Sequence, residues 1–489
     1  MVKYSCERCG KGFSQKSHYD SHNRRKTPCE NNADKIKELV YKAVEEKLKE
    51  LNNKKLIVEN EEVNINTKVM NTQQSKQQLK FIDLCCGIGG FHYALQHLGH
   101  KCVMASDINE DCRTNYEINH KIKPLGDLSK IDIKTIPNFD ILCAGFPCQP
   151  FSKAGAQNGF KDSRGNIFFD ICKIIEYHKP KYLILENVRN LTSHDRGNTW
   201  NTIKTSIDKL NYFTYDKPLI LNSLYFGVPQ SRERVVILCK RKDCGRLPVL
   251  PTISSKNKKK TCLSTIIEES VDEKYNITGK MKVTEEVWDN FLTILTKNKI
   301  KVPKFPIWTD WWDSDGENTS VTKYNKKIGE EENKKIISKK QKDFYKKYKG
   351  WIDKNRKFYK DHFALLHIWL VDSRKRKEWK GAVRKMEWQT GCDNLNMNQV
   401  LWSPRGSGIR IKNINYSPTL VAMVSMIPIY GPKSRQLTPR ECARLQSFPD
   451  DFIMHKKDKI AYKQFGNAVN VKMIERCARF MINEEELFI

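Results

Sequence analysis

Cys148 follows a proline at the end of an apolar segment, in a position where a thiol can act as a nucleophile. The segment FDILCAGFPCQPFS, residues 139–152, is typical of a buried strand that runs into Pro147 and Cys148. A structural cysteine is expected within the apolar run, where Cys143 stands. A cysteine after a proline in a polar loop is better suited to nucleophilic attack, provided that its surroundings stabilise the thiolate.

Two later segments carry charged side chains that could work beside such a thiol. The apolar run at residues 182–185 ends in Glu186, and the sequence QSRER places Arg232 and Arg234 just before the run VVIL. A carboxyl at a strand end can be a proton donor or a satisfied cap. Two neighbouring arginines can bind an anion or form surface ion pairs. Taken alone, each segment leaves both interpretations open.

A glycine-rich turn follows the first apolar run, FIDLCCGIGGF at residues 81–91. Such a turn between a strand and a helix lets the backbone approach a cofactor closely. The next strand ends in Asp107, where a carboxylate can accept hydrogen bonds from ribose hydroxyls, and a third strand is predicted to end near Gly126, Asp127 and Leu128. The chain has no Gly-x-x-x-x-Gly-Lys-Ser/Thr phosphate loop, so these ends indicate an adenosine-containing cofactor.

Short apolar runs alternate with helical patterns from residue 79 to residue 241, which predicts an α/β domain. The runs KFIDLCCG, HKCVMASD, FDILCAGFP, KYLILENV and RVVILCKR are β-rich and bounded by turn residues. Strands alternating with helices favour a doubly wound, mostly parallel, Rossmann-like sheet covered on both faces. Ligands bind such sheets at the carboxyl ends of the strands.

The alternation of short apolar runs and helical patterns is absent between residues 242 and 435. This region carries two lysine-dense segments and every tryptophan except Trp200. It predicts a smaller, irregular second domain. From residue 436 to residue 489 helical patterns return, and a turn leads into a final helix that rejoins the first domain.

The N-terminal 30 residues predict a small zinc-binding unit. Cys6, Cys9, His22 and Cys29, with Phe13 between them, resemble a ββα zinc finger in which Cys replaces the last His. His18 is an alternative third ligand. Zinc would fold a unit too small to bury its own core. Residues 31–78 are predicted to form an amphipathic helix, over 33–51, and then a polar linker.

Composition and charge point to an intracellular protein with a polyanionic partner. The 87 Lys and Arg residues exceed the 57 Asp and Glu residues, for a formal net charge of +30. Such an excess favours nucleic acid, although lysine-rich codon usage also contributes. No secretory signal or membrane span is expected, so the 16 cysteines are interpreted as reduced thiols, metal ligands or a nucleophile.

In their order along the chain, these motifs resemble those of the cytosine-5 DNA methyltransferase family. DLCCGIGG is similar to the family's cofactor motif and GFPCQPFS to its nucleophile motif, and DSRGNIFFDI, ENV, QSRER, LTPRECARLQSFPD and QFGNAV follow in family order. The resemblance extends from residue 79 to the C-terminus, apart from a variable insert near 242–400. Each motif is moderately specific, and the complete ordered series is highly specific.

The resemblance implies a role for each matching residue. Cys148 would add to carbon 6 of a flipped-out cytosine, Glu186 would hold a proton on ring nitrogen 3, and Arg234, with Arg232 nearby, would bind the base carbonyl. The loop 149–164 would close over the base. S-adenosylmethionine would be bound by a set of residues from several motifs: Asp83, Cys85, Gly87, Ile88, Gly89, Asp107, Ile108, Asp127, Leu128, Ile167 and Asn467.

Three positions depart from the family pattern. Cys85 stands where an aromatic residue is usual, Asp107 replaces the commoner Glu, and Asn470 stands where Pro is frequent. Because Cys148, Glu186 and Arg234 are all present, these departures are interpreted as tolerated variants.

The resemblance predicts an active enzyme on double-stranded DNA, working as a monomer. A tRNA cytosine-5 methyltransferase and an inactive DNA-binding regulator are the alternatives, and the long basic insert and the complete catalytic set argue against them. The segment Trp402–Val424 is expected to belong to the target-recognition domain, with Arg405 and Arg410 as candidate DNA contacts. A partner restriction endonuclease is compatible with this function, but neither it nor the target sequence can be derived from the residues.

Overall fold

The computed structural model describes residues 4–8, 11–25, 77–147, 167–312, 332–393 and 395–488. The chain divides into two compact units, Met1–Gln77 and Gln78–Ile489. In the first unit, strands β1 (Tyr4–Ser5) and β2 (Gly12–Phe13) pair in antiparallel and precede helix α1 (Lys16–Asn23). The helix predicted over 33–51 and the polar linker lie outside the described residues.

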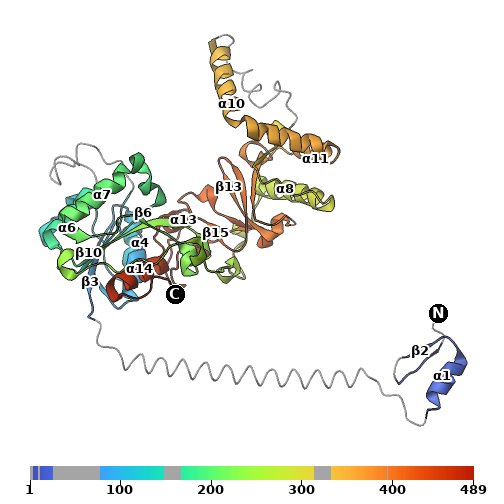
Figure 1. The fold of residues 1–489 in the computed structure, drawn as a ribbon, viewed down its shortest axis with the longest axis horizontal. Coiled ribbons are helices and arrows are strands. Elements are labelled where there is room, and N and C mark those ends of the chain that lie inside the picture. Colours follow the sequence, from blue (N-terminus) through green and yellow to red (C-terminus); the bar gives the residue numbers. More distant parts are fainter. Residues whose placement is uncertain are drawn as a thin grey trace. The chain divides into compact units, whose positions relative to one another are not determined.

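The larger unit contains the predicted α/β sheet (Figure 1). Its strand order is β4-β3-β5-β6-β10-β7, and β8 also pairs with β10. The first four strands of this order are parallel, and β10 pairs in antiparallel with β6, β7 and β8. The bounds are β3 (Lys80–Leu84), β4 (Lys101–Ser106), β5 (Ile141–Gly145), β6 (Tyr182–Val188), β7 (Tyr212–Phe213), β8 (Leu219–Asn222) and β10 (Glu233–Arg241). The prediction of an α/β sheet is confirmed, but the sheet is mixed: the pairings among β4, β3, β5 and β6 are parallel, and the three pairings of β10 are antiparallel.

Helices cover both faces of this sheet. Alternation along β5 sends Ile141 and Cys143 into one core and Leu142 and Ala144 into the other, as expected for a central parallel strand. The first core contains α3 (Gly90–Gln96) and α14 (Val471–Asn483), and the second contains α6 (Ile167–His178) and α7 (Asn198–Lys209). Helix α4 (Glu110–His120) follows β4. The last helix, α14, therefore shares a core with β3, β5 and α3.

The third predicted strand end is wrong. Leu125 makes only one parallel bridge, to Ser106, and Leu128–Lys130 is a short 3-10 helix. The side chain of Asp127 caps this turn by accepting the backbone N–H of Ser129. A cap of this kind starts a helical turn, and so the chain does not continue as a strand.

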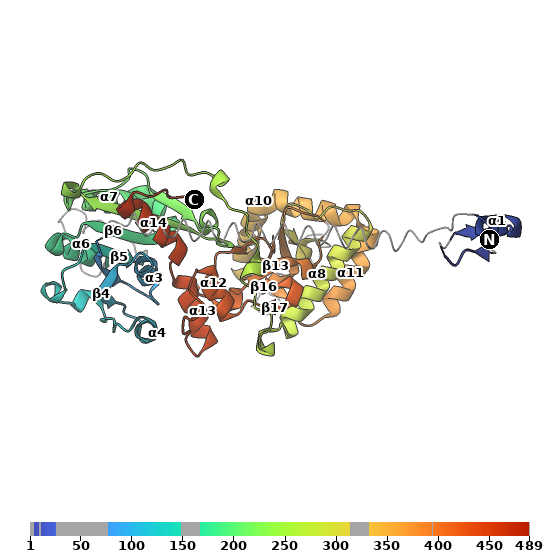
Figure 2. The same cartoon turned by 90° about the horizontal axis from the view of Figure 1, so that it is seen from below.

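The region predicted to be irregular forms a second sheet, in the order β11-β12-β14-β13-β16-β17. Its apolar face packs against a tryptophan-rich core that includes α8 (Gly279–Lys297) and α11 (Phe363–Lys375), which lie beside the strands in Figure 2. Helix α10 (Glu332–Asp361) precedes α11. The strands are β11 (Ile307–Trp308), β12 (Lys385–Gln389), β13 (Val400–Arg405), β14 (Gly408–Asn413), β16 (Ile429–Tyr430) and β17 (Arg435–Gln436).

A short two-stranded pairing connects this sheet to the first domain. β15 (Ser417–Pro418) runs parallel to β9 (Gln230–Ser231), which directly precedes β10. Helices α12 (Pro439–Leu445) and α13 (Asp458–Asn467) then lead to α14. Within the described ranges, no helix combines the length and the apolar character needed to cross a lipid bilayer.

Candidate active site

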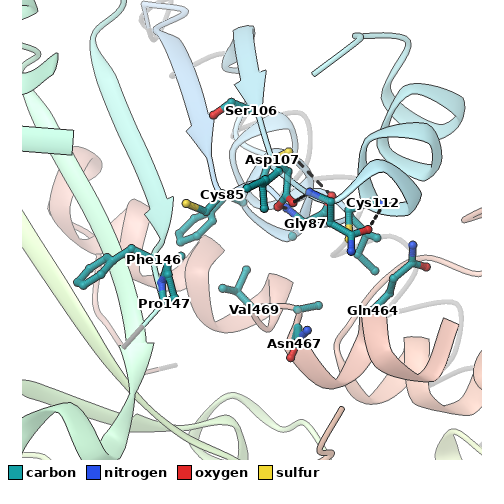
Figure 3. A pocket seen from close by; sticks show the side chains of 18 of the residues that line it. Cys85, Gly87, Ser106, Asp107, Cys112, Phe146, Pro147, Gln464, Asn467 and Val469 are labelled. Atoms are coloured by element: carbon teal, nitrogen blue, oxygen red, sulfur yellow. Dashed lines mark hydrogen bonds between the residues drawn. The ribbon is translucent and has the colours of Figure 1, made fainter. Parts of the chain in front are cut away.

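A cavity of about 1030 Å³ lies at the carboxyl ends of β3, β4, β5 and β6. This edge contains the point where the strand order reverses between β3 and β5, which is where open α/β sheets bind ligands. Residues of α13 and of the turn before α14 form the opposite wall, and Figure 3 shows Gln464, Asn467 and Val469 facing Gly87 and Asp107. The cavity therefore joins segments from both ends of the chain.

The side chain of Asp107 accepts a hydrogen bond from the glycine-rich turn that follows β3. Cys85, Gly87 and Gly89 all have positive φ angles, 52°, 55° and 87°, so the turn relies on glycine at two of its three left-handed positions. Oδ2 of Asp107 accepts the backbone N–H of Gly87 at 2.8 Å, and Oδ1 accepts that of Asn109 at 2.8 Å. Each carboxylate oxygen keeps a second lone pair for a ligand.

Nine of the eleven residues predicted to bind the cofactor line this cavity: Cys85, Gly87, Ile88, Asp107, Ile108, Asp127, Leu128, Ile167 and Asn467. Asp83 and Gly89 do not. Asp83 is fully buried in β3, and this burial raises the pKa of its carboxyl well above the usual value. A Cβ atom on Gly89 would lie 2.0 Å from Nε2 of His120, so this glycine permits a close contact behind the turn. Both residues therefore lie outside the cavity.

The cavity wall suits an adenosine-containing ligand. The side chain of Ile108 is 76% exposed although it is apolar, so a flat ring could cover it. Ser106 lines the same wall, and its buried Oγ has no hydrogen-bond partner among the described residues. Together with the Asp107 carboxylate, these groups offer both apolar surface and hydrogen-bonding atoms to a nucleoside.

Sequence reasoning missed several residues of the wall: Cys86, Phe91, Ser106, Cys112, Lys457, Lys459, Lys463 and Gln464. Gln464 bridges the two sides, because its Nε2 donates to the backbone oxygen of Asp111 at 3.1 Å. Ser106 was detectable, since it immediately precedes Asp107 at the end of a predicted strand. The lysines of the α13 region carry no such signal, because only the folded chain brings them to β4.

Glu186 and Arg234 form an ion pair inside the cavity. Nε of Arg234 lies 2.9 Å from Oε1 of Glu186, and both side chains line the cavity. The antiparallel pairing of β6 with β10 produces this contact, since Arg234 lies opposite Val188, two residues beyond Glu186. Burial raises the pKa of Glu186 above its usual value, and the positive charge of Arg234 partly offsets the increase.

Arg232 occupies a different environment from Arg234. It is 1% exposed and does not line the cavity. Its Nη1 donates to the backbone oxygen of Leu420, and its Nη2 donates to those of Gly466 and Ala468, at 2.8–3.1 Å. The predicted arginine pair is therefore divided: Arg234 faces the cavity, and Arg232 ties the C-terminal segments to β10.

Cys148 and the loop 149–164 lie outside the described residues, but the residues before them are placed. Phe146 and Pro147 line the cavity that contains Glu186 and Arg234 (Figure 3). Nδ2 of Asn187 donates to the backbone oxygen of Phe146 at 2.8 Å. This bond ties the end of β5, where the chain leaves toward Cys148, to the residue that follows Glu186.

Comparison with known proteins identifies the family. The family profile described as C-5 cytosine-specific DNA methylase matches residues 79–483. The chain is 32% identical over 450 residues to the type II methyltransferase M.BanI of Aneurinibacillus aneurinilyticus, covering 84% of this chain and 98% of that protein. It is 30% identical over 400 residues to M.HhaI of Haemophilus parahaemolyticus, covering 82% and 93%. The chain belongs to the C-5 cytosine-specific DNA methylase family.

Its reaction is therefore the transfer of a methyl group to carbon 5 of cytosine in DNA. Among solved structures, a crystal structure of an S. pombe Dnmt2 methyltransferase aligns with a TM-score of 0.43 at 16% identity, covering 83% of this chain and 99% of that one.

One departure from the pattern of this methylase family has a direct structural explanation. Asn470, which stands where Pro is frequent, caps α14: its Oδ1 accepts the backbone N–H of Met473 at 3.0 Å. Its Nδ2 also contacts the backbone oxygen of Leu445 and Oγ of Ser447, at 3.2 Å each. The asparagine therefore starts the helix with a side-chain cap, which a proline at this position could not supply.

The N-terminal unit has the ββα arrangement predicted for a zinc finger, and part of its predicted ligand set is described. Cys6 and His22 are buried, and the ring of Phe13 lies 5.0 Å from that of His22. Cys9 and Cys29 lie outside the described residues. Within the described part of the chain, no group of three or more His, Cys, Asp or Glu side chains could hold a metal ion.

Proposed function

We propose that this methylase acts through a covalent adduct between Cys148 and carbon 6 of a cytosine flipped out of duplex DNA. The observation that carries the proposal is the Glu186–Arg234 ion pair in a cavity that Pro147 also lines. Pro147 directly precedes Cys148 in the sequence, so a base held against this pair would share the cavity with the last described residue before Cys148. Flipping is required because carbon 6 is not accessible within a stacked duplex.

In this mechanism each side chain has one task. The Cys148 thiolate attacks carbon 6, and electron density moves into the ring toward carbon 5 and nitrogen 3. Glu186, whose pKa burial raises, holds a proton at nitrogen 3, and Arg234 binds the base carbonyl. S-adenosylmethionine supplies an electrophilic methyl group, which carbon 5 accepts. Loss of the carbon-5 proton to a base or water then allows Cys148 to leave with its electron pair.

Arg232 has a positioning role in this proposal. Its three bonds to backbone oxygens fix the segment before α14 relative to β10, and that segment carries Asn467 and Val469 of the cavity wall. S-adenosylmethionine would be held by Asp107 and Ile108 on one wall and by Asn467 on the other.

Two finer assignments accompany the mechanism. Because the named relatives are type II methyltransferases, we propose that the chain modifies one specific DNA sequence and protects it from a partner endonuclease. We also propose that Cys6, Cys9, His22 and Cys29 bind zinc. The burial of Cys6 and His22 within a ββα unit supports this ligand set.

The test is transfer of tritium from labelled S-adenosylmethionine to duplex DNA, with tRNA as a second acceptor. The wild-type chain is expected to label DNA, and Cys148→Ala is expected to lose the transfer while still binding S-adenosylmethionine by calorimetry. Robust labelling by Cys148→Ala contradicts the mechanism.

A further inference from the structure

The hairpin β13–β14 has one apolar and one charged face. In an antiparallel pair, residues opposite one another share a face, so Trp402 and Ile411 lie together in the core of the second sheet. Arg410 lies opposite Ser403 on the other face, and Lys412 and Arg405 share that face by alternation. The charged side chains of the hairpin are therefore gathered on the face opposite the tryptophan-rich core, together with the buried residues Leu401 and Ser403.

Glu387 joins this face from β12, opposite Arg410. Three cations on this face, Arg405, Arg410 and Lys412, outnumber the single carboxylate of Glu387. Burial lowers the pKa of both Arg405 and Lys412, and the positive charge of Arg410 lowers both further. Lys258 adds to the same effect on Lys412. Clustered cations repel one another in the free protein, so a polyanion that binds here relieves a cost that is already present.

Arg410 is oriented by its contact with Glu387. Nε and Nη2 of Arg410 lie 2.9 Å and 2.8 Å from Oε2 of Glu387, with side-chain exposures of 30% and 15%. This contact uses one edge of the planar guanidinium. Nη1 makes no hydrogen bond with any residue in the described ranges, so the edge formed by Nη1 and Nη2 keeps two N–H groups that Glu387 does not use. A fixed pair of N–H donors matches O6 and N7 of guanine in the major groove, which is the commonest base-specific contact of arginine, and the same pair can also bind two phosphate oxygens.

The charged face is connected to the cavity by a short stretch of chain. Leu401, at the base of the hairpin, belongs to the same hydrophobic core as β3 and α14. After β14, Ser417 pairs with Gln230, four residues before Arg234, and Oγ1 of Thr419 donates to the backbone oxygen of Ser231 at 2.7 Å. A base read on this hairpin would therefore be held in fixed register with the cytosine in the cavity.

We propose that Arg410, braced by Glu387, reads a guanine in the DNA target, while Arg405 and Lys412 bind the neighbouring phosphates. The proposal rests on the proposed function, because it requires duplex DNA as the substrate. It deepens that function by naming a specificity-determining residue and one base of the target.

The experiment is methylation of a randomised duplex library by the full chain, read by bisulfite sequencing. The wild-type pattern should contain a fixed guanine near the methylated cytosine. For Arg410→Ala, preference for that guanine should fall roughly 5- to 150-fold, which corresponds to the discrimination of about 1–3 kcal/mol given by one bidentate contact. Glu387→Gln keeps the charge of Arg410 but weakens the brace, so a smaller loss at the same position is expected.

Lys412→Ala is the matched control on the same face. It should weaken methylation of all sequences alike and reduce the salt dependence of DNA binding by about one counterion, without changing the preferred sequence. If Arg410→Ala is unstable by thermal unfolding, Arg410→Lys keeps the charge without the two-pronged edge and should still lose the guanine preference.

The possible results distinguish failure of the proposed role of Arg410 from failure of the proposed function. A wild-type target without a fixed guanine overturns the role of Arg410, and so does a uniform loss in the Arg410 variants with the preference intact, which is the result expected of a phosphate contact. Absence of cytosine-5 methylation by the wild-type chain contradicts the proposed function itself.

Discussion

Nε of Arg234 lies 2.9 Å from Oε1 of Glu186 in a cavity at the carboxyl edge of the sheet. The arginine limits how far burial can raise the pKa of the carboxyl. The pKa of this carboxyl is therefore set by two opposing effects, burial and the charge of Arg234.

Removing the arginine should move the pH dependence of catalysis. Because the charge of Arg234 lowers the pKa of Glu186, Arg234→Met should raise that pKa, and the alkaline limb of the single-turnover rate should shift to higher pH. The maximum rate should fall about 10²- to 10³-fold through loss of the carbonyl contact. Arg241→Met, at the far end of the same strand, is the control and should leave the pH profile unchanged. A limb that stays in place or moves to lower pH would show that Arg234 does not tune Glu186.

Arg232 and Arg234 should differ in their effect on stability. Arg232→Met leaves the backbone oxygens of Leu420, Gly466 and Ala468 without their buried donor, and should lower the free energy of unfolding by roughly 3 kcal/mol, measured by urea denaturation. Arg234→Met should lower it less, since Glu186 can become neutral. Wild-type stability of Arg232→Met together with loss of activity would instead support a catalytic role for Arg232.

Alanine substitutions at Gly89 and Gly99 distinguish the free-energy cost of backbone strain from that of a steric clash. Both have positive φ, 87° and 80°, but a Cβ on Gly99 meets no atom within 4 Å, whereas one on Gly89 meets the ring of His120. Gly99→Ala should cost about 1–2 kcal/mol of unfolding free energy. Gly89→Ala should cost about 1–3 kcal/mol more and weaken S-adenosylmethionine binding, measured by calorimetry. Equal losses in both variants would contradict a tight contact behind the turn.

The full chain should bind zinc, and substitution of a single ligand should abolish most of this binding. Purified wild-type protein is expected to contain about one zinc ion per chain by atomic emission, and Cys6→Ser should lose most of it. Cys392→Ser removes an exposed cysteine and should keep the zinc. Zinc-free wild-type protein, or a Cys6 variant with unchanged zinc, would contradict the ligand set.

The strands of the first domain were predictable because their apolar runs are short, continuous and bounded by turn residues. The short 3-10 helix at Leu128 was not predictable in this way, because the side chain of Asp127 caps a helical turn where the apolar pattern suggests a strand. In the second sheet the partners are distant in sequence: Ile307 pairs with Met386, and β12 pairs in parallel with β14. Strands of two to six residues with such distant partners leave little periodic signal.

The site was predictable where a strand end or a motif marks it. Asp107 directly follows β4, Glu186 is the third residue from the end of β6, and Arg234 belongs to a family motif. The motif predicts that Asp83 binds the cofactor, yet β3 is buried from Phe81 to Leu84 and Asp83 does not line the cavity. The different environments of Arg232 and Arg234 depend on contacts with residues 420–468, which the local sequence does not reveal.

The most direct measurement concerns the covalent bond at Cys148. Duplex DNA with 5-fluorocytosine at the target should trap the adduct, because fluorine cannot leave carbon 5 as a proton does. Peptide mapping by mass spectrometry should find the methylated base on Cys148, and Cys148→Ala should form no complex. Cys85 also lines the cavity, but burial raises the pKa of its thiol to about 12, so it should stay unmodified. An adduct on Cys85, or methylation without any trapped complex, would contradict nucleophilic attack by Cys148.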